Sequence, residues 1–297
     1  MKKIVILIII LQLLISCKKE VTNVVFENIK TDEFELLVSK QQKGLLILFP
    51  GGGGSAENIK KEFNIVQKAK EKGVSLLLLN FARKLWIENE DSEKLTTLIL
   101  ETIKKNNLKT NNIYIGGMSI GGNVALTLSD YLLKNKIVAV KGTFIVDSPI
   151  DLFGLYESSV KDIQRKDFSE ERLAEPKWIV SYFEERFTKD SLLNNIQQVS
   201  PFTYKTSNFN NIYNLKKTKL RLYTEPDERW WKEVRKTDYE STNAYRIRKL
   251  NNLLVADNWR KVTLIETNNK GYRANGDRNP HSWSIVNVDD LLDWILE

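Results

Sequence analysis

Ser119 is the residue of this sequence best placed to act as a nucleophile. It is the centre of the pentapeptide 117–121, GMSIG, which fits the pattern G-x-S-x-G. The pentapeptide directly follows a short apolar run at 113–115 and directly precedes a predicted helix over about 122–133. A sharp turn between a strand and a helix exposes the serine hydroxyl, and the positive end of the helix then faces the reacting group. The alternative interpretation is a glycine-rich packing turn.

A serine hydroxyl becomes a nucleophile only beside a base, and the base needs an acid that orients it. The only histidine is His281, which lies between the last predicted strand and the last predicted helix. For the acid we choose Asp227, in the loop that follows the predicted strand 220–223. Asp147, at the end of an earlier predicted strand, and Glu225 are the alternatives. The sequence therefore predicts a catalytic triad of Ser119, His281 and Asp227.

An acyl-transfer site also needs two backbone N–H groups that bind the oxyanion formed during attack. One predicted donor is Ile120, the residue after the nucleophile. The second should come from the loop 49–54, FPGGGG, because glycines let the backbone approach a ligand closely. Within this loop we favour Gly52 and then Gly51. A phosphate-binding loop is disfavoured, since no Gly-Lys-Ser/Thr follows the glycines.

Apolar runs without alternation punctuate the sequence and are typical of strands buried on both faces. Helical patterns separate them, and an alternation of this kind predicts an α/β fold with a mostly parallel central sheet and helices on both faces. A charged, aromatic and helical stretch at 152–215 interrupts the pattern, and we interpret it as a helical cap inserted over the sheet's carboxyl edge. The predicted strands cover 45–49, 74–79, 113–115, 143–146, 220–223 and 262–265, with a hairpin in 24–38 and a last helix over about 288–295.

In this order, the glycine loop, the serine turn, the acid after a strand and the late histidine resemble the α/β-hydrolase superfamily over about residues 24–297. Segment 275–284, NGDRNPHSWS, is similar to the histidine loop of uncharacterised secreted hydrolases of that superfamily. Members often carry His-Gly-Gly at the oxyanion loop, where this chain has Pro50. The resemblance implies the α/β-hydrolase fold and a serine hydrolase.

The reaction we expect is cleavage of a small or oligomeric carboxylic ester through an acyl-enzyme. A peptidase or amidase with the same triad, or a noncatalytic binding lipoprotein of the same fold, are the alternatives. Trp230 and Trp231 follow the chosen acid and are candidates to contact substrate. The pair 184–185, two glutamates, could hold a free amine but is typical of a solvated helix face. Tyr239 and Asn243 share a predicted helix face and could line the site.

The composition excludes several other functions. The chain has 297 residues, of which 42% are hydrophobic and 28% charged, as expected for one large globular domain. With one cysteine and one histidine it can build neither a cysteine-based nor a histidine-rich metal site, and we expect no metal and no cofactor. The net charge of +7 is spread along the chain, which disfavours nucleic acid as a partner.

The first residues predict export. A positive start precedes an apolar run that ends in Leu-Ile-Ser-Cys17, and this resembles the box of bacterial lipoprotein signals. The resemblance implies that 1–16 is a signal peptide, that Cys17 is acylated, and that 17–23 is a tether. We therefore expect an exported, membrane-anchored lipoprotein, periplasmic or on the cell surface. The domain that follows spans 24–297.

Overall fold

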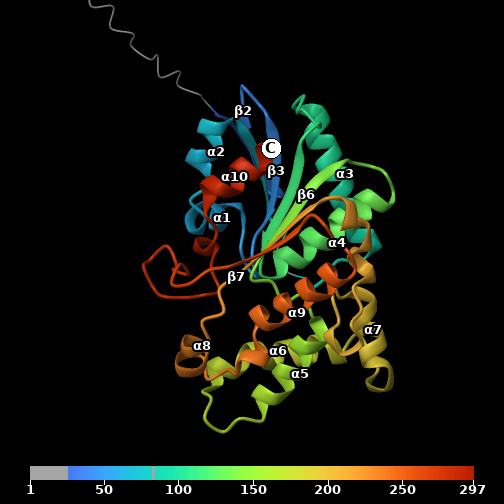
Figure 1. Cartoon of the computed structure of the whole chain (residues 1–297), viewed down its shortest axis with the longest axis vertical. Coiled ribbons are helices and arrows are strands. Elements are labelled where there is room, and N and C mark those ends of the chain that lie inside the picture. The colour runs from blue at the N-terminus through green and yellow to red at the C-terminus, as the bar shows by residue number, and fades with distance from the viewer. Residues whose placement is uncertain (1–25, 82–83) are drawn as a thin grey trace, which may run out of the picture.

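The computed structural model describes residues 26–81 and 84–297, which fold around an eight-stranded sheet (Figure 1). The strands are β1 (Phe26–Lys30), β2 (Phe34–Ser39), β3 (Gly44–Phe49), β4 (Val74–Leu79), β5 (Ile113–Met118), β6 (Val140–Val146), β7 (Lys219–Thr224) and β8 (Val262–Glu266). They lie in the order β1-β2-β4-β3-β5-β6-β7-β8. β2 is antiparallel to both of its neighbours, and all pairings from β4 to β8 are parallel. The predicted α/β fold with a mostly parallel sheet is confirmed.

β3, β4 and β5 are buried at every position because helices cover both faces of the sheet. Along β3, Leu46 and Leu48 belong to one buried cluster, whereas Leu45 and Ile47 belong to another on the opposite face. The first cluster packs under α1 (Ala56–Glu62), α2 (Val66–Lys72) and α10 (Val288–Leu296). The opposite face packs under α3 (Asn89–Lys105), α4 (Ile120–Lys134) and α9 (Asn243–Ala256).

After the strand β3, the sequence predicts one helix that is capped by Ser55 and runs to about Lys72, whereas the structure has two helices there. Ser55 caps α1 as its position suggests, with its hydroxyl oxygen accepting a bond from the Asn58 N–H at 3.4 Å. The chain then becomes extended at Phe63, with φ −116° and ψ 104°, before α2 begins. The Phe63 side chain is buried in the core below α10, and this tertiary contact interrupts the helix.

The stretch between β6 and β7 is helical, as predicted. It contains α5 (Leu152–Ile163), α6 (Glu170–Glu184), α7 (Leu192–Val199) and the 3₁₀ helix η3 (Asn210–Lys217). Figure 1 shows α5 and α6 grouped beyond one end of the sheet, where α8 (Glu228–Val234) also lies. Side chains of α5, α6 and α7 share a buried cluster with Trp86 and Ile120, whereas η3 packs on α4 at the sheet face. The interpretation of 152–215 as one cap stays a prediction.

In the ranges 26–81 and 84–297, no helix is both long and apolar enough to cross a membrane. The predicted signal peptide 1–16, Cys17 and the whole tether 17–23 lie outside the described residues.

Candidate active site

The predicted turn at Ser119 is present in the structure. β5 ends at Met118 and α4 begins at Ile120, so Ser119 alone makes the turn, at φ 53° and ψ −130°. A residue with a side chain is strained in this region of backbone space, typically by about 1–3 kcal/mol. The Ser119 N–H donates to the Val146 carbonyl oxygen at 2.9 Å, which fixes the turn to the end of β6. The serine is half-buried, at the end of β5, which pairs in parallel with β3 and β6.

Two glycines allow this turn to pack against its surroundings. A Cβ atom on Gly117 would lie 2.2 Å from the carbonyl oxygen of Gly121. A Cβ atom on Gly121 would lie 2.2 Å from the carbonyl oxygen of Pro50, in the glycine-rich loop after β3. Both obstacles are backbone atoms, which cannot rotate out of the way. The two outer glycines of the pentapeptide are therefore required by close backbone packing around Ser119.

Asp147 is the carboxylate that contacts His281. Its Oδ2 accepts a hydrogen bond from His281 Nδ1 at 2.6 Å, and its Oδ1 accepts one from the Thr224 hydroxyl at 2.6 Å. Asp147 directly follows β6, has φ 43°, and donates its N–H to the Tyr223 carbonyl oxygen at 2.8 Å. With 2% of its surface exposed, it is held from several sides in a site closed to water. We call Ser119, His281 and Asp147 the candidate triad.

The expectation that Asp227 orients His281 is wrong in this structure. Oδ1 of Asp227 accepts the Trp230 N–H at 3.0 Å and so caps α8, and Oδ2 pairs with Arg278 at 2.5 Å. Glu225, the other alternative, is buried and also pairs with Arg278 at 2.5 Å. Arg278, three residues before His281, thus pairs with both acids that follow β7, whereas His281 binds Asp147, the acid that follows β6.

Two further side chains hold Asp147, and sequence reasoning found only one of them. Asn243, predicted to line the site, donates its Nδ2–H to the Asp147 carbonyl oxygen at 2.8 Å. Thr224 was missed, since a threonine at the end of a strand carries no distinguishing pattern. The Tyr239 hydroxyl is buried without a hydrogen-bond partner among the described residues, and burial raises the pKa of Tyr239.

His281 lies near the end of a long loop, 267–282, which runs from β8 to the 3₁₀ helix η5 (Trp283–Ile285) and which we call the histidine loop. Its N–H donates to Asn279 Oδ1 at 2.9 Å, and its side chain is 24% exposed. Two residues later, Trp283 is buried and stacks on Phe63 with ring centroids 4.5 Å apart and planes 11° apart. Because Asp147 occupies Nδ1, Nε2 is the ring nitrogen left to accept a proton.

The glycine-rich loop lies over the serine turn, as an oxyanion loop should. A Cβ atom on Gly51 would lie 3.5 Å from the Cβ of Ser119, and one on Gly52 would lie 3.5 Å from Cδ1 of Ile120. The loop is closed by a bond from the Gly54 N–H to the Gly51 carbonyl oxygen at 2.9 Å. As the first residue of α4, Ile120 has an N–H without an acceptor in its own helix. Which amides bind an oxyanion stays a prediction.

The other side chains predicted to contact substrate lie on α8 and at the end of α6. Trp230 and Trp231 lie on α8, half-buried and edge to face, with ring centroids 5.1 Å apart. Their contact with substrate stays a prediction. In the pair 184–185, Glu184 accepts a hydrogen bond from the Tyr156 hydroxyl at 3.0 Å, and Glu185 is exposed at the C-terminal end of α6.

No three His, Cys, Asp or Glu side chains come together as a possible metal site within the described ranges.

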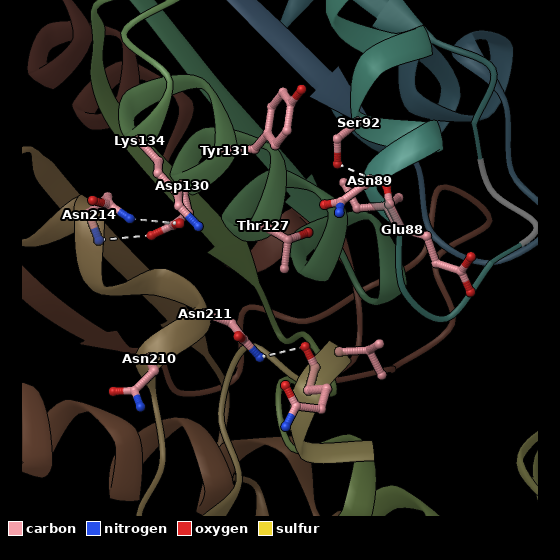
Figure 2. A pocket seen from close by; sticks show the side chains of 13 residues that line it. Glu88, Asn89, Ser92, Thr127, Asp130, Tyr131, Lys134, Asn210, Asn211 and Asn214 are labelled. Atoms are coloured by element: carbon pink, nitrogen blue, oxygen red, sulfur yellow. Dashed lines mark hydrogen bonds between the residues drawn. The ribbon is translucent and has the colours of Figure 1, made fainter. Parts of the chain in front are cut away.

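A polar pocket of about 390 Å³ lies elsewhere, between α3, α4, α7 and η3 (Figure 2). None of the candidate triad lines it. Both oxygens of Asp130 accept bonds from Asn214, and the Asn211 amide donates to carbonyls at the end of α7, so these groups join helices (Figure 2). Burial raises the pKa of Asp130. The lining comprises Ile87, Glu88, Asn89, Ser92, Thr127, Asp130, Tyr131, Lys134, Gln198, Val199, Asn210, Asn211 and Asn214.

No protein-family model and no curated protein matches this sequence. Solved structures do match in shape. Substrate-bound FphF, a fluorophosphonate-binding serine hydrolase of Staphylococcus aureus, superposes with a TM-score of 0.55 at 10% identity, over 92% of this chain and 98% of its own. The esterase EstE5 gives 0.55 at 14% identity, over 91% and 84% of the two chains.

Carboxyl esterase 2 of the mycorrhizal fungus Tuber melanosporum gives a TM-score of 0.51 at 15% identity, over 84% of this chain and 78% of its own. At such low identities the likeness concerns the fold. Together with the strand order and the turn at Ser119, it establishes that the chain has the α/β-hydrolase fold.

Proposed function

We propose that this protein is a serine hydrolase that cleaves a carboxylic ester, with Ser119 as nucleophile, His281 as base and Asp147 as the orienting acid. The observation that carries the proposal is the 2.6 Å bond between His281 Nδ1 and the buried Asp147 carboxylate. The chain's only histidine is thereby fixed in one tautomer at the end of β6, and β6 pairs with β5, the strand that ends at the strained serine.

In this mechanism, Ser119 Oγ attacks the ester carbonyl carbon while its proton passes to His281 Nε2. The oxygen that becomes negative is bound by backbone N–H groups of Ile120 and of Gly52 or Gly51. Collapse of the intermediate breaks the bond to the alkoxy group, which leaves with the proton from His281. A water molecule then loses a proton to His281 and attacks the acyl-enzyme, and Ser119 and a carboxylic acid are released.

An ester of an apolar acid is the substrate class best supported. Ile120 shares its buried cluster with Trp86 and Phe183, so the side of the turn facing α6 is apolar. Two of the structural neighbours reported above are named esterases, which adds support for an ester over an amide. The paired glutamates proposed for amine binding in a peptidase are partly used elsewhere, since Glu184 binds the Tyr156 hydroxyl.

A fluorophosphonate probe tests the proposal directly, because it reacts only with an activated serine. We expect the detergent-solubilised full chain to be labelled, and Ser119→Ala not to be labelled. Labelled protein is then assayed against acyl esters of graded chain length, acetylated sugars and aminoacyl amides. An unlabelled wild-type protein would favour a noncatalytic binding protein, and turnover of amides alone would favour a peptidase.

We further propose that Cys17 carries lipid and tethers this domain to a membrane. The support is the sequence alone: an apolar run of export-signal length that ends at the chain's only cysteine. Cys17→Ser should release the protein from the membrane fraction or leave residues 1–16 uncleaved. Wild-type protein found free, cleaved and without an acyl group would refute the tether.

A further inference from the structure

Glu225 is a buried carboxylate that the hydrolytic mechanism does not use. Only 1% of its surface is exposed, yet it accepts bonds from four groups of the histidine loop. These donors are the Thr267 hydroxyl at 2.8 Å, the Lys270 N–H at 2.8 Å, the Gly271 N–H at 3.2 Å and the Arg278 guanidinium at 2.5 Å. Glu225 itself lies just after β7, so it joins the start and the end of this loop to the sheet.

Arg278 extends this connection to within three residues of His281. Its Nη2 contacts Glu225 and Asp227, both at 2.5 Å, and its Nη1 donates to the Gly271 carbonyl oxygen at 2.7 Å. The same Gly271 oxygen accepts the Asn279 N–H at 2.9 Å. Arg278 thus clamps the two arms of the histidine loop together at the point where the chain turns toward the imidazole.

The two arms touch so closely at this point that a side chain would not fit. A Cβ atom on Gly271 would lie 2.5 Å from the Asn279 carbonyl oxygen and 2.6 Å from the Pro280 Cα. The residue after Pro280 is His281. A shift of the Gly271 arm is therefore transmitted through backbone contacts to the histidine.

We infer that Glu225 and Arg278 are positioning residues that hold His281 against Asp147, an inference that rests on the hydrolase function proposed above. Neither touches the candidate triad by a hydrogen bond. A carboxylate suits this place because it is an acceptor only, with enough lone pairs for all four donors. An amide in its place would turn an NH₂ group toward N–H donors and would leave Arg278 with Asp227 alone.

The tautomer of His281 is a readout that a merely structural role would not move. With a single histidine in the chain, one set of imidazole signals appears in a long-range ¹H–¹⁵N correlation spectrum. At a pH where the ring is neutral, wild-type protein should show the Nδ1–H tautomer, because Asp147 accepts that proton. In Glu225→Gln we expect a mixture of both tautomers in a protein that stays folded by circular dichroism.

Activity supplies the second readout. Glu225→Gln should lower the rate of fluorophosphonate labelling of Ser119 and kcat for ester hydrolysis by roughly 10- to 100-fold, since a displacement of about 1 Å can cost that much. KM should change less than twofold. Glu228→Gln is the matched control: it removes the same charge at an exposed position three residues along, and it should behave as wild type.

Arg278→Met decides the matter if Glu225→Gln does not fold. It leaves Glu225 with three donors, and we expect a 5- to 20-fold loss of labelling rate together with a mixed tautomer. Arg260→Met is its control, because it makes the same substitution at an exposed position just before β8. A pure Nδ1–H tautomer and labelling within twofold of wild type in the folded variants would overturn the inference. Wild-type protein that is not labelled would contradict the hydrolase proposal. The tautomer of His281 in the variants would still test whether Glu225 and Arg278 position the imidazole.

Discussion

The serine turn and the histidine loop hold their functional side chains by different means. The turn at Ser119 is made by neighbours in the sequence: a strand, two glycines and a helix within 113–134, packed backbone to backbone. The histidine loop is held by contacts between residues far apart in the chain: Arg278 pairs with Glu225 on one side, and Trp283 stacks on Phe63 on the other. A short sequence motif therefore reveals the backbone packing around Ser119, whereas no local pattern reveals hydrogen bonds and ion pairs between residues far apart in the chain.

This difference predicts how a mutation in each region will affect the protein. In the turn, the obstacles around the glycines are main-chain atoms, so damage there should affect folding. In the histidine loop the contacts are hydrogen bonds and ion pairs of a segment that follows the last strand, so a mutation there should displace the imidazole and leave the sheet intact.

Ser119→Ala should abolish turnover and leave the fold intact. The nucleophile is lost, so kcat for the best ester substrate should fall by about 10³-fold or more. Alanine has the same Cβ and fits the same turn, so urea unfolding should be nearly unchanged. Steady-state kinetics and urea titration check both statements, and residual activity above a tenth of wild type would exclude Ser119 as the nucleophile.

Asp147→Asn should be the most damaging change at any acid. The asparagine keeps the shape but cannot accept the Nδ1 proton as a carboxylate does, so the wrong tautomer forms and the imidazolium loses its partner. We expect kcat to fall by about 10²- to 10⁴-fold. Asp227→Asn is the matched comparison and should cost less than about fivefold, because Asp227 binds Arg278 at a partly exposed position. The reverse order would restore Asp227 as the orienting acid.

The sequence prediction and the structure differ at one member of the triad, the acid that orients His281. Apolar runs separated by helical patterns predicted the sheet and its helices, and the G-x-S-x-G motif predicted the turn at Ser119. Asp147 and Asp227 both follow strands that neighbour one another, so spacing alone could not separate them. What separates them is Arg278, which pairs with Asp227 and Glu225 only once the loop has folded back. The break in the first helix at Phe63 has a similar origin, because Trp283, 220 residues later, packs there.

Gly271→Ala should move the histidine without unfolding the protein. The added Cβ meets Asn279 and Pro280 backbone atoms, so the arms of the loop must separate. Overpacking of this kind costs typically about 1–3 kcal/mol of stability, and we expect kcat to fall by roughly tenfold. Asn275→Ala, in the exposed turn of the same loop, should change neither the stability nor kcat. Wild-type kinetics in Gly271→Ala would indicate that the two arms move independently of His281.

Ser119→Gly should make the protein inactive and slightly more stable. At φ 53° and ψ −130° any residue with a Cβ atom is strained, whereas glycine is not. Relief of about 1–3 kcal/mol is partly offset by the larger entropy that glycine loses on folding, about 0.5–1 kcal/mol, which leaves a gain of roughly 1 kcal/mol in the free energy of unfolding. Urea titrations of Ser119→Gly and Ser119→Ala compare two inactive proteins that differ by one methyl group. If the glycine variant is no more stable than the alanine variant, the turn holds no strain, and the backbone around Ser119 fits its side chain better than its φ and ψ angles imply.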